Sequence, residues 1–201
     1  TSFRMTIGMV QPDEGKVIFE GHDISKLPMY RRARMGIGYL SQEPSVFQRL
    51  TVEQNLLAIL ETMSLTRSDR LRRANELIGQ FGLEKVRKSD ARVLSGGERR
   101  KLEIARSLVT NPSLILLDEP FSGVDPIAVE DLQREIRSLQ DRGISILITD
   151  HNVERTLEVV DRAYIINEGQ VLAAGTPKEL VNNKLVRDTY LGQSFRGDEF
   201  D

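Results

Sequence analysis

The stretch that most restricts the fold is LILLDEP (residues 114–120), in which four large apolar residues run directly into two carboxylates. Such an unbroken apolar run is typical of a strand that is buried on both faces. Burying an unpaired charge is costly, so Asp118 and Glu119 should meet a cation, or a proton to be moved, where the strand ends. The stretch therefore predicts a core strand with a chemical site at its carboxyl end.

Composition narrows the class of protein. The chain has 201 residues, of which 39% are apolar and 29% charged, as expected for a soluble globular protein. Its net charge of −2 does not suggest a nucleic-acid binder, and the lack of cysteine excludes disulfides and thiolate chemistry. No apolar run approaches the roughly 20 residues that span a bilayer, and the start lacks the long apolar stretch of a signal peptide. Any membrane role should therefore come through a partner.

Further strands are expected on both sides of this stretch. Residues 15–24 predict a strand, a Gly-centred turn and a second strand, and residues 35–42 predict a short apolar strand. Residues 143–150 predict a second buried strand, and residues 162–175 predict a hairpin that turns at Glu168–Gly169.

Apolar periodicity and capping residues predict the helices. The predicted helices are residues 51–63 with a Thr51–Gln54 capping box, residues 68–83 with an apolar stripe of Leu71, Leu77, Ile78 and Phe81, residues 125–139 with Asp125 as N-cap and Pro126 first, residues 153–160, and a helix opened by Thr176, Pro177 and Glu179. The order is mixed strands, a helical block over about 44–110, and then alternating strands and helices. This alternation predicts an α/β fold with a parallel sheet covered by helices on both faces.

The carboxylate pair lies where ligands of parallel sheets gather, beyond the carboxyl ends of the strands. Asp118 could hold Mg²⁺ there, directly or through water. Glu119, in extended backbone, would point the other way and could take a proton from an attacking water. The alternative for an isolated Asp-Glu pair is a carboxylate that caps a following turn. The apolar run before it and PFSGVD after it favour the chemical interpretation.

A second candidate site is LSGGE (residues 94–98). Ser95 suits an N-cap and Glu98 lies three residues on, so an ordinary capped helix start is one interpretation. Two glycines in a first helical turn, however, cost about 1 kcal/mol each relative to alanine. That cost is reasonable if the bare N–H groups of Gly96 and Gly97 must approach an anion, for which phosphate is the natural choice.

Two more polar residues follow predicted strands. His151 comes directly after residues 143–150 and could hydrogen-bond a terminal phosphate, although a lone histidine there is more often structural. Gln42 ends its own strand and could reach the same metal or water. Parallel strand ends meet at one sheet edge, so these residues could be neighbours of the carboxylate pair.

Taken in order, these motifs resemble the nucleotide-binding subunit of ABC transporters over essentially the whole chain. The corresponding family motifs are Gln42 (Q-loop), Ser95, Gly96, Gly97 and Glu98 (signature), Asp118 and Glu119 (Walker B), Asp125 (D-loop, here SGVD where SALD is usual) and His151 (switch histidine). The resemblance implies that Glu119 polarises the attacking water and His151 holds the γ-phosphate. It also implies ATP hydrolysis with Mg²⁺ near Asp118 and Gln42.

The family's phosphate loop, G-x-x-x-x-G-K-[ST], does not occur in this sequence. Its only Gly-Lys pair, Gly15–Lys16, is followed by Val17 and has Val10 where the first glycine should be. The opening residues instead look like the helix that follows that loop. We therefore expect an N-terminal segment to be missing from this sequence; a natural protein without the loop, which would be a non-hydrolysing binding module, is the alternative.

The resemblance implies a P-loop-NTPase-like ABC core in three parts: residues 1–43, a helical subdomain over 44–107, and residues 108–201. It also implies a head-to-tail homodimer that encloses two ATP molecules, with Ser95 and Gly97 of one chain serving the partner's nucleotide. Two transmembrane subunits would place the chain in the cytoplasm, on the inner membrane. The transported substrate and nucleic acid would not touch it.

Within the family, several stretches, above all YLGQSFR (residues 190–196), resemble the ATPases of lipopolysaccharide-export transporters. Branched-chain amino acid import ATPases share DHNV and are the alternative, and soluble ABC ATPases acting on DNA or ribosomes are another. The membrane subunits should dock beside the helical block. The candidate contacts are Phe47, Leu50, Leu56 and Leu57, although either Leu56 or Leu57 could be core.

Overall fold

The computed structural model describes residues 1–123 and 126–191 in two compact units. Within the described residues, the first unit holds residues 1–120 and 126–149, and the second holds residues 121–123 and 150–191. The three-part division expected from the sequence stays a prediction. No helix in the described part of the chain combines the length and the apolar character needed to cross a membrane.

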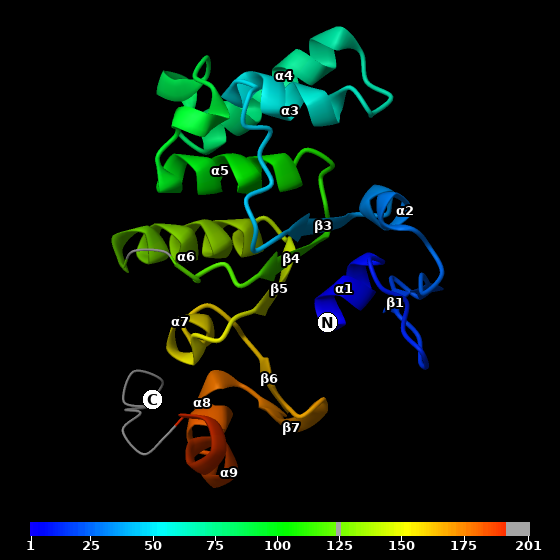
Figure 1. Cartoon of the computed structure of the whole chain (residues 1–201), viewed down its shortest axis with the longest axis vertical. Helices are drawn as coiled ribbons and strands as arrows, with labels where there is room; N and C mark the ends of the chain where they lie inside the picture. Colours follow the sequence, from blue (N-terminus) through cyan, green and yellow to red (C-terminus); the bar gives the residue numbers. More distant parts are fainter. Residues whose placement is uncertain (124–125, 192–201) are drawn as a thin grey trace. The chain divides into compact units, whose positions relative to one another are not determined.

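The first unit contains most of the regular structure (Figure 1). Its strands are β1 (Ile18–Phe19), β2 (His22–Asp23), β3 (Ile37–Leu40), β4 (Leu114–Asp118) and β5 (Ser145–Thr149). Its helices are α1 (Ser2–Ile7), α2 (Met29–Arg34), α3 (Val52–Leu60), α4 (Arg67–Gln80), α5 (Gly96–Ser107) and α6 (Pro126–Asp141), with 3₁₀ turns at Glu84–Val86 and Ala91–Val93. The second unit contains α7 (Val153–Leu157), β6 (Ala163–Asn167), β7 (Gln170–Gly175), α8 (Pro177–Val181), α9 (Lys184–Val186) and a π-helical turn at Arg187–Leu191.

The central sheet is parallel, in the order β3-β4-β5. The three central residues of β4 are buried, as the apolar run predicted, because β4 has a neighbour on each side. The register pairs Leu40 with Leu117 and Asp118 with Thr149, so the three strands end at nearly the same level. The prediction of a core strand that ends in carboxylates is confirmed.

Both faces of this sheet are covered (Figure 1). On one face, Phe3 and Ile7 of α1 and Ile24 after the β1-β2 hairpin form a buried cluster with Ile37 and Leu116. Helices α5 and α6 run along the opposite face. There Gly38 allows close packing, because a Cβ at this position would lie 3.2 Å from the Ile115 side chain and 3.4 Å from the Ser107 carbonyl oxygen. The predicted two-sided helical cover is confirmed.

The prediction that residues 143–150 form a second buried strand is wrong, because no residue of β5 is fully buried. Leu147 is 41% exposed, and Ser145 is exposed as well. Among the described strands, β5 lies at one edge of the sheet. Leu147 pairs with Leu116 and so shares its face, but the buried cluster on that face reaches no farther than Leu116. An apolar run alone does not tell a central strand from an edge strand.

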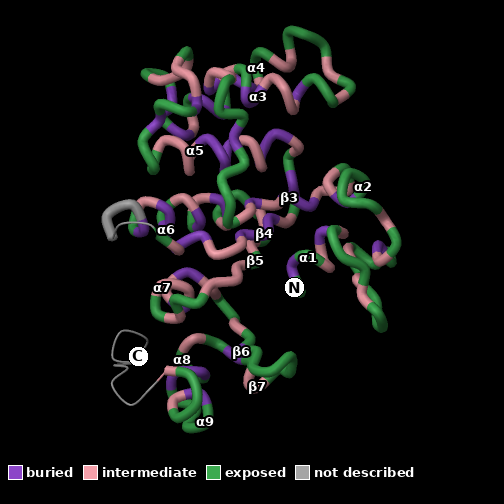
Figure 2. Tube along the Cα trace, viewed as in Figure 1, coloured by how far each residue is buried: buried purple, intermediate pink, exposed green. Residues whose placement is uncertain are grey.

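The helical block consists of α3, α4 and α5, whose buried stretches alternate with exposed ones (Figure 2). Helix α3 begins with the predicted capping box: Gln54 N donates to Thr51 Oγ1 at 3.2 Å, and Thr51 N donates to the Gln54 side chain at 2.9 Å. Helix α4 buries Ala74, Leu77 and Ile78. Leu71 lies nearer the start of the helix, before these buried positions, and is 38% exposed. The inclusion of Leu71 in the apolar stripe that faces the core is therefore wrong.

The second unit forms around the β6-β7 hairpin, which turns at Glu168 and Gly169 as predicted. Both turn residues have positive φ, 49° and 78°, as two-residue hairpin turns commonly require. Helix α8 begins with the predicted box between Thr176 and Glu179. The hairpin and helices α7 to α9 share one small apolar core.

A buried arginine holds the N-terminal part of the first unit together. Arg32 on α2 is only 1% exposed, and its guanidinium donates to four backbone carbonyls. Two acceptors, Met5 and Thr6, are on α1 at 2.7 Å; Ser25 and Leu27 accept at 2.8 Å from the segment before α2. Arg32 thus joins α1, the chain after the hairpin and α2.

Replacing Arg32 by methionine should lower the free energy of unfolding by at least about 3 kcal/mol, because several buried carbonyls would lose their donor. The control is Arg31→Met on the same helix, where the side chain is exposed; it should change stability by less than about 0.5 kcal/mol. Urea unfolding of the two variants measures both effects. Equal stabilities would contradict this role for Arg32.

Candidate functional site

The ends of β3 and β4 bring three predicted site residues together. Gln42 follows β3, and its side-chain amide donates to Glu119 Oε2 at 2.8 Å. Asp118 is the last residue of β4, immediately before Glu119. The sequence-based prediction that Gln42 lies beside the carboxylate pair therefore agrees with the geometry, and it follows from the parallel pairing of the two strands.

Asp118 is held by hydroxyl groups from both neighbouring strands. Tyr39 of β3 donates to Oδ2 at 3.1 Å, and Thr149 of β5 donates to Oδ1 at 2.6 Å. Burial, and secondly the charge of Asp118, raise the pKa of Tyr39, so its hydroxyl keeps the donated proton at neutral pH. Each carboxylate oxygen accepts one of these bonds and has a further lone pair. The carboxylate is oriented and can still accept a ligand.

Sequence reasoning missed Tyr39 and Thr149. The signal that could have found them is strand parity combined with register. Tyr39 pairs with Leu116, two residues before Asp118, and Thr149 pairs with Asp118 itself. All three side chains therefore lie on one face of the sheet.

Glu119 does not continue the strand, so the expectation of extended backbone there is wrong. Its φ is 46°, in the left-handed region that costs a non-glycine residue about 1 kcal/mol or more. Its N–H donates to the Thr149 carbonyl at 2.7 Å, which holds the turned backbone against β5. The side chain is thereby directed to Gln42 rather than to the opposite face of the sheet.

The LSGGE motif forms the N-terminus of α5, as predicted. Ser95 is the N-cap: Glu98 N donates to Ser95 Oγ at 3.3 Å, and Ser95 N donates to Glu98 Oε2 at 2.9 Å. The Ser95 hydroxyl also donates to the same carboxylate oxygen at 2.8 Å. These bonds from Ser95, the side-chain bond first and the backbone bond second, lower the pKa of Glu98.

Gly96 and Gly97 have no steric reason to be glycine within the described chain. Both are exposed, and a Cβ added at either would meet no atom within 4 Å. Neither has the positive φ that favours glycine. The first turn of α5 therefore presents uncovered backbone to the outside at a cost in helix stability.

His151 belongs to the second unit, where it follows a buried carboxylate. The side chain of Asp150 is 0% exposed and that of His151 is 69% exposed, and the Nδ1 to Oδ1 distance is 3.7 Å. Asp150 also accepts from Phe121 N at 2.9 Å and Asn152 N at 2.8 Å. Asp150 thus fixes the loop of His151 to the segment that begins two residues after Glu119. Sequence reasoning missed Asp150, because a hydrophilic residue beside a histidine carries no signal of burial.

The predicted site residues therefore divide between the units: Gln42, Asp118, Glu119 and the Ser95 turn belong to the first, and His151 belongs to the second. Asp125, the expected D-loop residue and helix N-cap, lies outside the described residues.

The side chains around Asp118 determine whether a metal ion could bind there. In residues 1–123 and 126–191, no group of three or more His, Asp or Glu side chains could hold a metal ion by itself. Mg²⁺ usually takes one or two carboxylates and completes its shell with water and substrate phosphates. An oriented Asp118 with free lone pairs fits that requirement.

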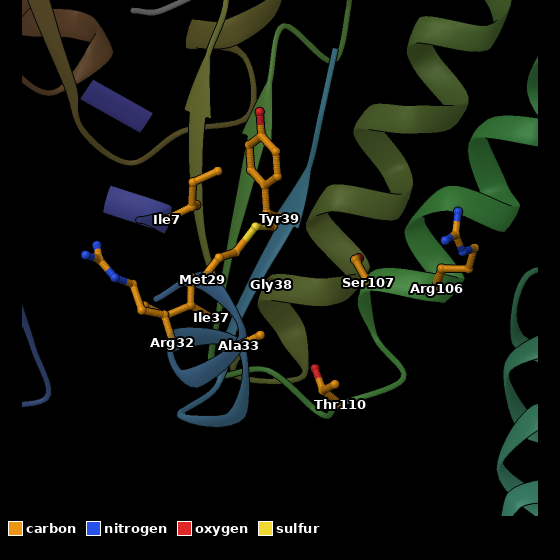
Figure 3. A pocket seen from close by; sticks show the side chains of 10 residues that line it. All are labelled: Ile7, Met29, Arg32, Ala33, Ile37, Gly38, Tyr39, Arg106, Ser107 and Thr110. Carbon is orange, nitrogen blue, oxygen red and sulfur yellow. The ribbon is translucent and has the colours of Figure 1, made fainter. Parts of the chain in front are cut away.

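A pocket of about 170 Å³ lies elsewhere in the first unit, between α2, β3 and the end of α5 (Figure 3). Its two guanidinium groups, Arg32 and Arg106, lie at opposite ends of the pocket. Arg32 already donates to four carbonyls. The two charges therefore do not converge on a shared ligand. The pocket lining includes Tyr39, the hydroxyl partner of Asp118, but neither Asp118 nor Glu119.

Several known proteins are similar to this chain in sequence. The profile of the ABC transporter family matches residues 1–122. The lipopolysaccharide export system ATP-binding protein LptB of Haemophilus influenzae is 51% identical over 197 residues, which cover 98% of this chain and 82% of that protein. The protein of the same name from Escherichia coli K12 is 52% identical over the same length, with the same coverage.

Two solved structures extend the likeness to the fold. The ATP-binding cassette MJ1267 of an ABC transporter superposes with a TM-score of 0.84 at 28% identity, covering 96% of this chain and 83% of the other. The structure of cbiO1 from Clostridium perfringens, part of the ABC transporter complex cbiONQ, gives 0.83 at 26% identity and covers 99% and 81%.

The class of protein follows from the fold, from the carboxylates Asp118 and Glu119 at the end of β4, and from these matches: it is an ATPase of the ATP-binding-cassette type. More particularly, the chain belongs to the ABC transporter family. The family, fold class and ATP hydrolysis expected from the sequence are thereby confirmed.

The capping box of α5 predicts a specific pH dependence. Because the folded-state pKa of Glu98 is lowered from 4.5, its contribution to stability is present above that value and is lost as pH falls through the folded-state pKa. Glu98→Gln should therefore be less stable than the wild type at pH 7, and this difference should shrink as pH is lowered from 4.5 through the folded-state pKa of Glu98. Urea unfolding across this range measures the difference; an equal gap at both ends would contradict the role of the charge.

Proposed function

We propose that this chain is the ATP-hydrolysing subunit that powers the export of lipopolysaccharide from the inner membrane. Its similarity to two proteins named for that system, at 51% and 52% identity over 98% of the chain, supports this substrate class. The observation that carries the motor role is the placement of Gln42, Asp118 and Glu119 together at the carboxyl ends of β3 and β4.

In this proposal Glu119 orients the attacking water and accepts its proton, while Gln42 holds the carboxylate in place at 2.8 Å. Asp118, fixed by its two hydroxyl partners, holds Mg²⁺ with Gln42. Bound Mg²⁺ would supply charge neutralisation at the phosphates. His151 hydrogen-bonds the γ-phosphate, and Asp125 serves as the D-loop residue of the nucleotide site.

The uncovered glycines favour a homodimer. Glycine at positions 96 and 97 costs helix stability without relieving any contact in the described chain. A second copy in head-to-tail arrangement supplies the reason, since its nucleotide phosphates would approach the N–H groups of this turn. Ser95, Gly96, Gly97 and Glu98 then serve the partner's ATP.

The membrane subunits dock at Phe47 on the cytoplasmic face of the inner membrane, according to this proposal. The Phe47 ring is 46% exposed on the loop before α3 and is stacked under Arg106 at 4.5 Å. The sequence-based inclusion of Leu56 among the docking residues is wrong, because Leu56 is 0% exposed in the core. Leu50 and Leu57 are partly buried and remain candidates at the rim.

Glu119→Gln should abolish the activity of the full-length protein in a complex with its membrane subunits. Loss of the general base should slow ATP hydrolysis by at least about 100-fold. In vesicles that contain lipopolysaccharide, the wild-type complex should release the lipid when ATP is added, and the variant complex should not. Release of branched-chain amino acids instead of the lipid would favour the import alternative, and hydrolysis at the wild-type rate would exclude Glu119 as the base.

Phe47→Ala should weaken co-purification with the membrane subunits by at least about tenfold, since an exposed aromatic anchor is lost. The isolated subunit should hydrolyse ATP at its normal rate. The matched control is Tyr30→Ala, which removes another exposed aromatic ring with an arginine over it, at 5.7 Å. Unchanged co-purification of the Phe47 variant, or equal loss in the control, would exclude Phe47 as the anchor.

A further inference from the structure

The loop between β3 and α3, residues 41–50, is irregular, yet side chains hold its backbone firmly at two points. At Ser45, the N–H donates to Glu103 Oε1 at 3.0 Å, and the carbonyl accepts from Arg106; both partners are on α5. At Phe47, the N–H donates to Asn55 Oδ1 at 2.8 Å, and the carbonyl accepts from Asn55 Nδ2 at 3.1 Å. The backbone N–H and C=O of both residues are therefore hydrogen-bonded.

The residues that hold the loop are unusually buried for polar groups. Asn55 is 0% exposed and its amide also donates to the carbonyls of Leu50 and Thr51. Glu103 is 5% exposed and is paired with Arg100 at 3.1 Å. Replacing a buried ion pair by apolar residues is often neutral for stability, so folding alone gives weak grounds for placing a charge here. What the buried groups fix is the position of one loop.

The same loop carries two residues of the proposed motor. Gln42 lies three residues before Ser45 and bonds Glu119, and Phe47 lies two residues after it. Arg106 contacts the loop twice, through the Ser45 carbonyl and through the face of the Phe47 ring. A displacement of α5 would therefore move the backbone and the exposed ring together.

Helix α5 also carries the signature turn at its other end. Ser95 caps the helix, and Glu103 lies eight residues further on, about 12 Å along a rigid α-helix. A force applied at the first turn thus reaches Glu103 and Arg106 without bending any loop.

We propose that Glu103 and Arg106 are positioning residues that couple the signature turn of α5 to the loop of Phe47, so that closure of the dimer on ATP is passed to the membrane subunits. This inference rests on the proposed function, in which Ser95 faces the partner's nucleotide and Phe47 docks a membrane subunit. Neither residue touches the reacting atoms.

The test compares ATP hydrolysis by the isolated full-length subunit with hydrolysis by its complex with the membrane subunits. The measured quantity is the factor by which assembly changes the rate. In Glu103→Ala this factor should fall close to one, while hydrolysis by the isolated subunit stays within about twofold of the wild type. Glu103→Gln, whose side-chain oxygen can still accept from Ser45 N, should restore most of the factor.

Two further variants make the result specific. Arg106→Lys keeps a charge near the Ser45 carbonyl but loses the planar group over the Phe47 ring. This variant should fold and should lower the factor, so it tests the coupling even if Glu103→Ala does not fold. Glu76→Ala removes the ion pairs of Glu76 with Arg72 and Arg73 on α4, none of which contacts the loop. This variant should leave the factor unchanged.

A wild-type factor in folded Glu103→Ala and Arg106→Lys would overturn the coupling. So would a parallel loss of hydrolysis in the isolated subunit, because that would indicate a merely structural or catalytic defect. The factor does not depend on which lipid is moved. A wild-type complex that hydrolyses ATP without moving lipopolysaccharide would therefore reject the proposed substrate, while the same variants still decide the coupling.

Discussion

The register of β4 between its two neighbours is the constraint on which the rest of the site depends. Because Asp118 pairs with Thr149 and Leu116 with Tyr39, the carboxylate meets two hydroxyl donors on one face. A slip of one residue would turn Asp118 to the opposite face and separate it from both donors. Close packing at Gly38, against Ile115 and the end of α5, fixes that register. The core and the chemical site are therefore set by the same contacts.

Helix α5 is the element through which the helical block and the sheet depend on each other. Its last turn leads through a short connection into β4, and Arg73 of α4 donates to the Leu108 carbonyl at 3.0 Å and also bonds Asn111 in that connection. Its middle holds Ser45 in the loop that leaves β3. One helix thus leads into β4 and is also bonded to the loop that leaves β3.

The sequence was a good guide wherever the determining interaction is local. Capping boxes depend on residues three positions apart, so Thr51, Ser95 and Thr176 were found from spacing alone. The exposure of Leu147 depends on which strand lies at the edge, and the left-handed backbone of Glu119 depends on a carbonyl of another strand. The buried side chains that hold the site in place depend in the same way on distant parts of the chain.

The hydrogen bonds of the Ser95 turn bear on how tightly this turn could bind the phosphate proposed for it. The Ser95 hydroxyl has a single proton, which it donates to Glu98 in this structure. An anion that approaches Gly96 and Gly97 competes with that carboxylate for the proton and also meets its negative charge. The exchange of one hydrogen bond for another has a small net free energy, about 1 kcal/mol. Phosphate binding at this turn, as proposed above, would therefore be weak unless other contacts of the proposed closed dimer add to it. Weak binding would suit a proposed site that has to open again after each hydrolysis.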